Sequence, residues 1–317
     1  MTDFNAGYQA MFKQGHLTLG LFMPLESYAG DVPVMADQEQ LAALAEEYKF
    51  AALWFRDVPL RDPTFGDVGQ IFDVWVYLAW IAAHTRKIAL ATGSVVLPLR
   101  HPLHVAKAAA SVDRLSGSRL VLGLASGDRP VEFPAFGIER DHRGELFREY
   151  FLGLRQALTE DFPHFYASYG RLNGSADTLP KPEACVPMLV TGNSQQSPDW
   201  IAEHADGWIT YPRSPAHQEQ LLRGWNTAVA EQGQGPFKPF AQSLYIDLSE
   251  NPEEPSRPIH LGFRSGRNEL LRFLLKLEQI GVNHVVLNLK YGRRPAKDVI
   301  QELGEEVLPL LSGTCND

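Results

Sequence analysis

The chain alternates between short apolar runs and longer segments in which apolar residues recur at helical spacing. Eight runs are rich in apolar residues and lack strict alternation with polar ones, which is typical of parallel strands covered on both faces. These runs are 17–22, 51–55, 88–99, 119–125, 187–192, 207–211, 243–248 and 284–289. A helical pattern follows each run, and this rhythm predicts an α/β protein with a parallel sheet.

Eight such repeats within 317 residues fit a closed (β/α)8 TIM barrel. A doubly wound sheet has the same rhythm, but no Gly-rich dinucleotide fingerprint follows the first strand, which favours the barrel. We predict a single domain over residues 1–317. We also predict an insertion between strands four and five, because residues 162–182 show no clear periodicity. In a barrel, functional side chains lie where strands end, so the strand exits hold the candidate residues.

Several predicted helices have recognisable ends. Asp37 precedes an amphipathic segment and is expected to cap it. Ser197 and Ser214 each precede a proline, the favoured order for a helix start. Gly117 is expected to end the helix before it. An apolar helix is predicted over residues 71–83.

Composition narrows the class of protein. Apolar content of 44% and charged content of 21% are those of a soluble globular protein. A net charge of −9 argues against nucleic-acid binding. We expect a cytoplasmic protein without membrane contact, because we find no signal-peptide pattern and no apolar run that could span a bilayer. The two cysteines, Cys185 and Cys315, lie outside any CxxC pattern, which fits a reducing compartment.

The third apolar run, KIALATGSVVLPLRHP, is interrupted by small residues around Gly93. A glycine within a strand pattern indicates a bulge or another surface that approaches the backbone closely, such as a flat ring system. The ordinary alternative is a strand that bends as it leaves the sheet.

The exits of strands four and five, ASGDRP and TGNSQQS, are small and rich in hydroxyl groups. Exposed N–H groups, short hydroxyl side chains and one cation together suit a phosphate. Arg129 would supply the cation, and Ser194 and Ser197 would supply hydroxyl groups. The alternative is a pair of ordinary turns, since Gly, Asn and Ser dominate turns.

The other strand exits carry weaker signals. Arg56 and Asp57 end strand two, where they would position a ligand or form an ion pair between loop and barrel. Lys290 belongs to a basic stretch after strand eight, and a solvated rim is the favoured interpretation. His101 and His104 have no accompanying ligands, so capping or packing is favoured and no metal is predicted. Neither a nucleophile elbow nor a P-loop is found.

Four segments carry a resemblance to a known family. They are ATGSVVLPLRHP, DRLSGSRLVLGLASGDRPVEFPAFG, VTGNSQQSPDWIAEHADGWI, and LGFRSGRNELL with GVNHVVLNLKYGRRP. With these segments the chain resembles the bacterial luciferase-like flavin-dependent oxidoreductases, and within them a luciferase-type subgroup. The resemblance covers most of the chain from strand three onward and specifies no substrate.

The resemblance implies a flavin at the C-terminal mouth of the barrel. It also implies a non-prolyl cis peptide in strand three, and the matching bond here is Ser94–Val95. The loop around residues 263–267 and the chain between strands four and five would wall the substrate pocket. The predicted cofactor-binding residues are Gly93, Ser94, Val95, Ser126, Gly127, Arg129, Thr191, Gly192, Asn193 and Ser194.

The activity implied is that of an FMN-dependent monooxygenase, which uses reduced FMN and O2 on a small organic substrate while the protein excludes water. Asp57 and His101 are the candidate catalytic residues, by position. WFRDVP holds no histidine, unlike the luciferase pattern near strand two, so light emission is not expected. The alternatives are hydride transfer with the deazaflavin coenzyme and flavin binding without turnover. Implied partners are a small-molecule substrate, a flavin reductase that supplies reduced FMN, and a second copy of the chain in a homodimer or larger oligomer.

Overall fold

The computed structural model describes residues 3–233, 235 and 237–312, so Cys315 lies outside the described residues. Within them, the apolar runs form a closed barrel of parallel strands in the order β10, β13, β1, β2, β3, β5, β8, β9, which β9 closes by pairing with β10. The predicted (β/α)8 fold is confirmed. The barrel strands are β1 (Thr18–Phe22), β2 (Ala52–Phe55), β3 (Ala89–Thr92), β5 (Leu120–Ala125), β8 (Met188–Thr191), β9 (Gly207–Thr210), β10 (Phe240–Leu248) and β13 (His284–Asn288).

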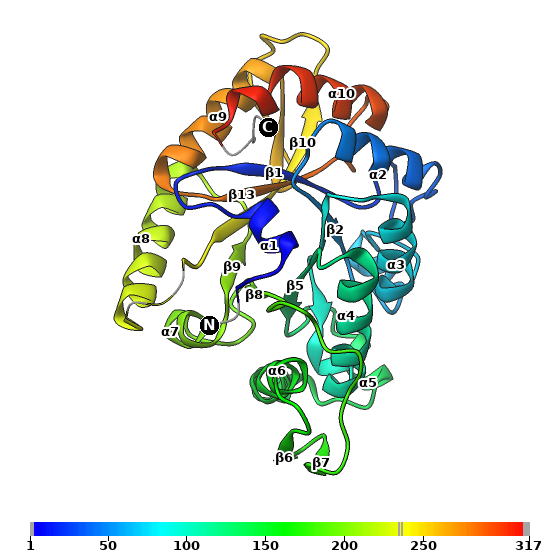
Figure 1. Cartoon of the computed structure of the whole chain (residues 1–317). Coiled ribbons are helices and arrows are strands. Elements are labelled where there is room, and N and C mark those ends of the chain that lie inside the picture. Colours follow the sequence, from blue (N-terminus) through cyan, green and yellow to red (C-terminus); the bar gives the residue numbers. More distant parts are fainter. Residues whose placement is uncertain (1–2, 234, 236, 313–317) are drawn as a thin grey trace.

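Helices surround the barrel (Figure 1). They are α2 (Gln38–Glu47), α3 (Val74–His84), α4 (Pro102–Ser116), α6 (Arg143–Thr159), α7 (Pro198–His204), α8 (Pro215–Glu231), α9 (Arg267–Ile280) and α10 (Ala296–Glu306). Ser197 and Ser214 cap α7 and α8 as predicted. Gly117 ends α4 in the left-handed conformation.

Two helix starts differ from the prediction. Asp37 precedes α2 but makes no capping hydrogen bond, because its backbone is left-handed (φ 54°) rather than extended. The apolar helix begins at Val74 rather than at residue 71. The carboxylate of Asp73 accepts from the N–H groups of Trp75 and Val76 and so fixes the start of α3.

Short elements join these strands and helices. Between β5 and β8 lie α5 (Glu132–Ala135), η3 (Arg140–His142), α6, and a hairpin of β6 (His164–Ala167) and β7 (Gly170–Asn173). The hairpin falls where the sequence shows no clear periodicity; Figure 1 shows it at the outer end of this segment, beyond α6. The remaining short elements are η1 (Pro63–Phe65), β4 (Val95–Val96), η2 (Leu97–Leu99), β11 (Arg257–Ile259), β12 (Gly262–Ser265) and η4 (Leu308–Leu310).

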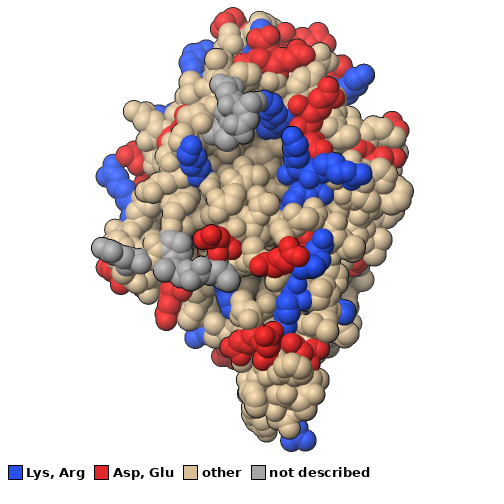
Figure 2. Space-filling model, viewed as in Figure 1, with Lys and Arg blue, Asp and Glu red and all other residues tan. Residues whose placement is uncertain are grey.

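A helix that the sequence did not predict, α1 (Ala6–Met11), packs at one end of the barrel. The Asn5 side chain caps α1 and donates to Asp113 Oδ1 (2.9 Å) and the Leu120 carbonyl (2.7 Å). A Cβ on Gly7 would lie 2.5 Å from the Arg119 carbonyl oxygen, so only glycine allows this approach. On the face of the molecule that carries α1, acidic and basic side chains are interspersed among uncharged ones (Figure 2).

The barrel interior contains a buried histidine. Trp54 Nε1 donates to His284 Nε2 (3.0 Å), and His284 Nδ1 lies 2.7 Å from Thr18 Oγ1. A Cβ on Gly20 would lie 2.7 Å from His284 Nε2, so glycine in β1 makes room for the ring. Burial lowers the pKa of His284 to about 3, which keeps the ring neutral.

We predict that His284→Gln changes the pH dependence of stability. In the unfolded chain the imidazole has a pKa of about 6.5. Between that pH and about 3, the unfolded chain therefore binds one more proton than the folded protein. The contribution of the neutral His284 ring to the free energy of unfolding is therefore complete above about pH 6.5 and is lost as the pH falls towards 3. His284→Gln, which keeps an acceptor for Trp54, should flatten the pH dependence of the unfolding free energy by about 1.4 kcal/mol per pH unit in urea titrations.

The exposed His142 provides the matched control, because His142→Gln removes an imidazole without touching the barrel interior. This variant should keep the slope of the unmodified protein. Equal slopes for the unmodified protein and His284→Gln would contradict the prediction.

Candidate functional site

The strand-three interruption lies at the C-terminal mouth of the barrel. β3 ends at Thr92, the Gly93–Ser94 peptide bond is cis, and the chain rejoins the sheet where Val95 pairs with Leu124 of β5. A non-prolyl cis peptide is present here, but its predicted position at Ser94–Val95 is wrong by one bond. Val95 already belongs to a paired strand, so the irregularity is completed before it.

Hydrogen bonds to the ends of β2 and β8 hold this bulge. Gly93 N donates to the Phe55 carbonyl (2.6 Å), and Asp57 N donates to the Ser94 carbonyl (3.3 Å). On the other side, Ser94 Oγ donates to Thr191 Oγ1 at the end of β8 (2.5 Å). Ser94 and Thr191, two of the predicted cofactor residues, are therefore brought together.

Asp57 is bound on all sides by protein groups. Its Oδ1 and Oδ2 accept from Arg100 Nη2 (2.7 Å) and Nε (2.8 Å), and Oδ2 also accepts from Val96 N (3.2 Å). The Asp57 side chain is 2% exposed and that of Arg100 is 25% exposed. Because Asp57 contacts Val96, Arg100 and Ser94, it fixes the path of the chain on both sides of the bulge.

His101 lies at the outer rim and is exposed. Its Nδ1 accepts from Leu103 N at the start of α4 (3.2 Å), and its Nε2 lies 3.0 Å from the Tyr169 carbonyl in the turn between β6 and β7. This arrangement links α4 to the hairpin. In the part of the chain that the structure describes, no three His, Cys, Asp or Glu side chains gather as a metal site.

The exits of β5 and β8 meet through Ser126 and Ser194. Ser126 N donates to Ser194 Oγ (3.2 Å), and Ser194 Oγ donates to the Thr191 carbonyl (2.9 Å). Gly127, Gly192 and Ser194 have positive φ angles of 88°, 59° and 45°. Such turns direct successive N–H groups to one side, as in the concave loops that bind anions.

These two loops contain backbone N–H groups that are not paired with an acceptor among the described residues. Among the described residues, the backbone N–H groups of Gly127, Asp128, Asn193 and Ser194 have no protein acceptor. A side chain built at Gly192 would meet nothing within 4 Å, so the loop is open there. Neutral donors in two adjacent loops suit a phosphate group.

Arg129, which was predicted to supply the cation of a phosphate site, instead contacts the segment that contains Phe65 and Asp67. Its Nη2 donates to the Asp67 carbonyl (2.7 Å), and its guanidinium lies 4.6 Å from the centre of the Phe65 ring. Glu132 Oε1 lies 3.8 Å from Arg129 Nη1. Burial raises the pKa of Glu132 to about 7, against the effect of Arg129. The sequence did not single out Glu132, because its burial comes from the fold.

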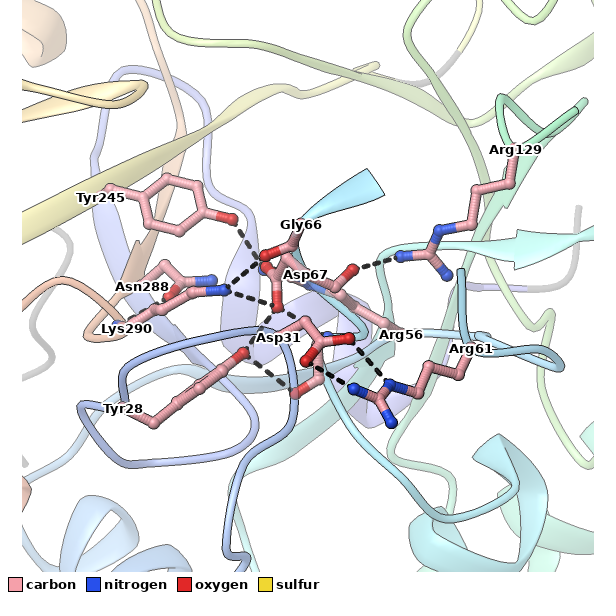
Figure 3. A network of polar contacts seen from close by, with 11 residues as sticks. Tyr28, Asp31, Arg56, Arg61, Gly66, Asp67, Arg129, Tyr245, Asn288 and Lys290 are labelled. Carbon is pink, nitrogen blue, oxygen red and sulfur yellow. Dashed lines mark hydrogen bonds and ion pairs between the residues drawn. The ribbon is translucent and has the colours of Figure 1, made fainter. Parts of the chain in front are cut away.

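A second polar cluster lies at the mouth around the carboxylate of Asp67 (Figure 3). Asp67 Oδ2 pairs with Arg56 Nη1 (2.7 Å), and Oδ1 pairs with Lys290 Nζ (3.1 Å) and accepts from Tyr28 OH (2.7 Å). Arg56 Nη2 also donates to Tyr245 OH (2.9 Å). Burial opposes the charge of Asp67, but the Arg56 guanidinium and the Tyr28 hydroxyl hold the pKa of this carboxyl well below its usual range.

We call Arg56, Lys290, Tyr28 and Tyr245 the cationic cluster. Arg56 and Lys290 are among the residues noted at the strand exits, but the prediction of a solvated rim is wrong for Lys290, whose side chain is 4% exposed. Tyr28, Asp67 and Tyr245 were missed, because they come from a loop, another loop and a strand far apart in the sequence. None of the helices in the described part of the chain combines the length and the apolar character that a membrane span requires.

Comparison with known sequences identifies relatives. The sequence profile of luciferase-like monooxygenases matches residues 15–287. An uncharacterised protein of Mycobacterium tuberculosis is 30% identical over 240 residues, 70% of this chain and 82% of that protein. An F420-dependent hydroxymycolic acid dehydrogenase of the same species is 28% identical over 200 residues, 62% of this chain and 54% of that enzyme.

Solved structures share the fold at low sequence identity. Monooxygenase RslO1 from Streptomyces bottropensis has a TM-score of 0.76 at 19% identity, covering 92% of this chain and 99% of that one. An F420-dependent secondary alcohol dehydrogenase with an F420–acetone adduct has a TM-score of 0.75 at 17% identity, covering 92% and 98%. The oxygenating constituent of 3,6-diketocamphane monooxygenase from Pseudomonas putida, in complex with FMN, has a TM-score of 0.72 at 13% identity, covering 93% and 99%. With a profile match over most of its length, the chain belongs to the luciferase-like monooxygenase family.

Proposed function

We propose that this protein is an FMN-dependent monooxygenase that acts on a small organic substrate at the C-terminal mouth of its barrel. The observation that carries the proposal is the pair of loops joined by Ser126 N and Ser194 Oγ, with N–H groups that lack protein acceptors among the described residues. The FMN phosphate would accept from these groups. The flavin ring would then extend towards the bulge at Gly93–Ser94.

Each group at the mouth has a role in this proposal. Ser94, held by Thr191, would present the bulge to one face of the flavin ring. Reduced FMN would supply the electrons that activate O2. Every polar side-chain atom of Asp57 and of His101 contacts a protein group, so we propose them as positioning residues rather than as the acid or base.

Hydride transfer with the deazaflavin coenzyme F420 is the second candidate function. One similar protein and one similar structure are described as F420-dependent, and another similar structure is described as an FMN complex, so these relatives divide between the two cofactors. The loops of β5 and β8 offer neutral donors, while Arg129 is engaged with Asp67 and Phe65. A single phosphate suits this set of donors better than a long polyanionic tail does, which favours FMN.

Phosphate recognition predicts that FMN binds more tightly than riboflavin, which lacks the phosphate. Asn193→Asp places a carboxylate among the free N–H groups without changing side-chain size. It should weaken FMN binding about tenfold, or roughly 1.4 kcal/mol, through like-charge repulsion. Riboflavin binding should not change. Flavin fluorescence titration measures both affinities, and the same titration with F420 compares the two cofactors.

Asn226→Asp, an exposed position on α8, serves as the control for added charge. Equal affinities for FMN and riboflavin in the unmodified protein would refute phosphate recognition at these loops. Tighter binding of F420 than of FMN would favour the second candidate function.

The Asp57–Arg100 pair should support both stability and flavin binding. Asp57→Asn leaves a partly buried guanidinium without its main partner and should cost about 2–3 kcal/mol of stability. It should also raise the dissociation constant of FMN, because the bulge loses its support. Asp73→Asn is the matched control: Asp73 contacts the same guanidinium at 3.3 Å from an exposed position, and asparagine keeps its capping of α3. Equal losses in the two variants, by urea denaturation and FMN titration, would contradict the role of Asp57.

We also propose that the protein is a homodimer through α3. Phe72, Val76 and Trp80 are spaced by four residues and are 49%, 69% and 53% exposed. Phe72 lies just before α3 and the other two residues lie on it, and such a row of exposed apolar side chains suits contact with another protein surface. Trp80→Glu should convert the dimer to a monomer in light scattering at fixed concentration, whereas Tyr166→Glu, at an exposed aromatic residue of the hairpin, should not. A monomeric unmodified protein would contradict this proposal.

A further inference from the structure

The carboxylate of Asp67 occupies a site built mostly from strand exits. Arg56 directly follows β2, Lys290 lies two residues beyond β13, Tyr28 lies in the loop after β1, and Tyr245 belongs to β10. Figure 3 shows these side chains converging on Asp67. A guanidinium, an ammonium and a phenol hydroxyl around one carboxylate form charge-assisted hydrogen bonds, which are the strong ones.

This site holds more positive than negative charge. The side chains of Arg56 and Lys290 are 17% and 4% exposed, yet both share the single carboxylate of Asp67. The other acids of this region have their own partners: Asp31 pairs with Arg61 (2.8 Å), and Glu132 lies beside Arg129. Burying a cation without a full counter-charge costs free energy. The cationic cluster is therefore suited to bind a second anion beside Asp67, or an anion that binds more strongly in its place.

Asp67 comes from a different kind of element than its partners. It lies in the loop between η1 and α3, next to Gly66 and two residues before Gly69, whose φ angles are 76° and 74°. The loop is held by contacts such as Val68 N to the Asp31 carbonyl (3.0 Å) and Arg129 Nη2 to the Asp67 carbonyl (2.7 Å). Departure of this loop would leave Arg56, Lys290 and Tyr245 on or just beyond their strands, with Tyr28 N bonded to the Lys290 carbonyl (3.1 Å).

The cationic cluster and the free N–H groups lie on different parts of the mouth. The cluster belongs to the adjacent strands β10, β13, β1 and β2, whereas the N–H groups follow β5 and β8. β3 separates the two sets on one side of the ring, and β9 separates them on the other. A cofactor phosphate bound after β5 and β8 therefore leaves the cluster available to a second molecule.

We propose that Arg56, Lys290, Tyr28 and Tyr245 recognise a carboxylate group of the organic substrate, and that Asp67 occupies this site until the substrate displaces it. The inference rests on the proposed function in taking the same mouth as the substrate site. Substrate binding then exchanges one carboxylate for another, and the loop that carries Asp67 is released. The substrate class is a small organic acid.

The test compares benzoate with its neutral analogue benzamide by isothermal titration calorimetry, in the unmodified protein and in Asp67→Asn. Removing the internal competitor should tighten benzoate binding about tenfold or more, because the open site becomes the populated one. Benzamide binding should not change. Asp31→Asn removes the same charge from a neighbouring loop without touching the cluster, and it should leave benzoate binding unchanged.

Two further measurements separate a specific site from a general loss of loop order. In Asp67→Asn, the added substitution Lys290→Met should abolish the gain in benzoate affinity. In the unmodified protein, benzoate but not benzamide should speed hydrogen exchange of residues 60–72. Equal benzoate affinity in the unmodified protein and Asp67→Asn, or equal gains for benzoate and benzamide, would overturn the inference.

Titration in the presence of FMN separates this inference from the proposed function. Simultaneous binding of FMN and benzoate supports both. Competition between them would assign the cationic cluster to the cofactor, which overturns the inference and leaves the proposed function standing. Benzoate binding without any FMN binding would overturn the proposed function but support the carboxylate site.

Discussion

Closure of the barrel by pairing of β9 with β10 is the constraint on which the site depends. Because the barrel strands are parallel, closure brings every strand exit to one mouth, although those exits are spread over more than two hundred residues of sequence. Ser126 can thus contact Ser194 although the two are 68 positions apart, and Arg56 after β2 can contact Tyr245 of β10 although β1 and β13 lie between these strands in the barrel. The site is formed by contacts between loops, and the barrel fixes the positions of those loops relative to one another.

The mouth has two regions whose hydrogen-bond donors suit an anion, and they differ in character. After β5 and β8, neutral backbone donors are arranged by residues in the left-handed conformation. After β1, β2 and β13, charged and phenolic side chains surround one carboxylate. Arg129 connects the two regions, since it follows β5 and bonds to the carbonyl of Asp67. This hydrogen bond joins the loop after β5 to the loop that carries Asp67.

The fold and part of the site could be predicted because they follow from local pattern. Strands buried on both faces leave continuous apolar runs, and turns that expose N–H groups need the Gly, Asn and Ser residues found after β5 and β8. The predicted position of the cis bond was wrong by one residue. That position depends on where Val95 pairs with Leu124, a contact between distant segments. The gathering of the cationic cluster around Asp67 could not be predicted for the same reason. Its members, Tyr28, Asp67, Tyr245 and Lys290, have no common spacing and meet only in the closed barrel.

A crystal structure of the protein soaked with FMN would locate the phosphate and the flavin ring at the mouth. We predict that the phosphate lies within hydrogen-bond distance of the N–H groups of Asn193 and Ser194, with the flavin ring against the bulge at Ser94. A phosphate bound instead between Arg56 and Lys290, or a mouth that holds no flavin at saturating concentration, would contradict it.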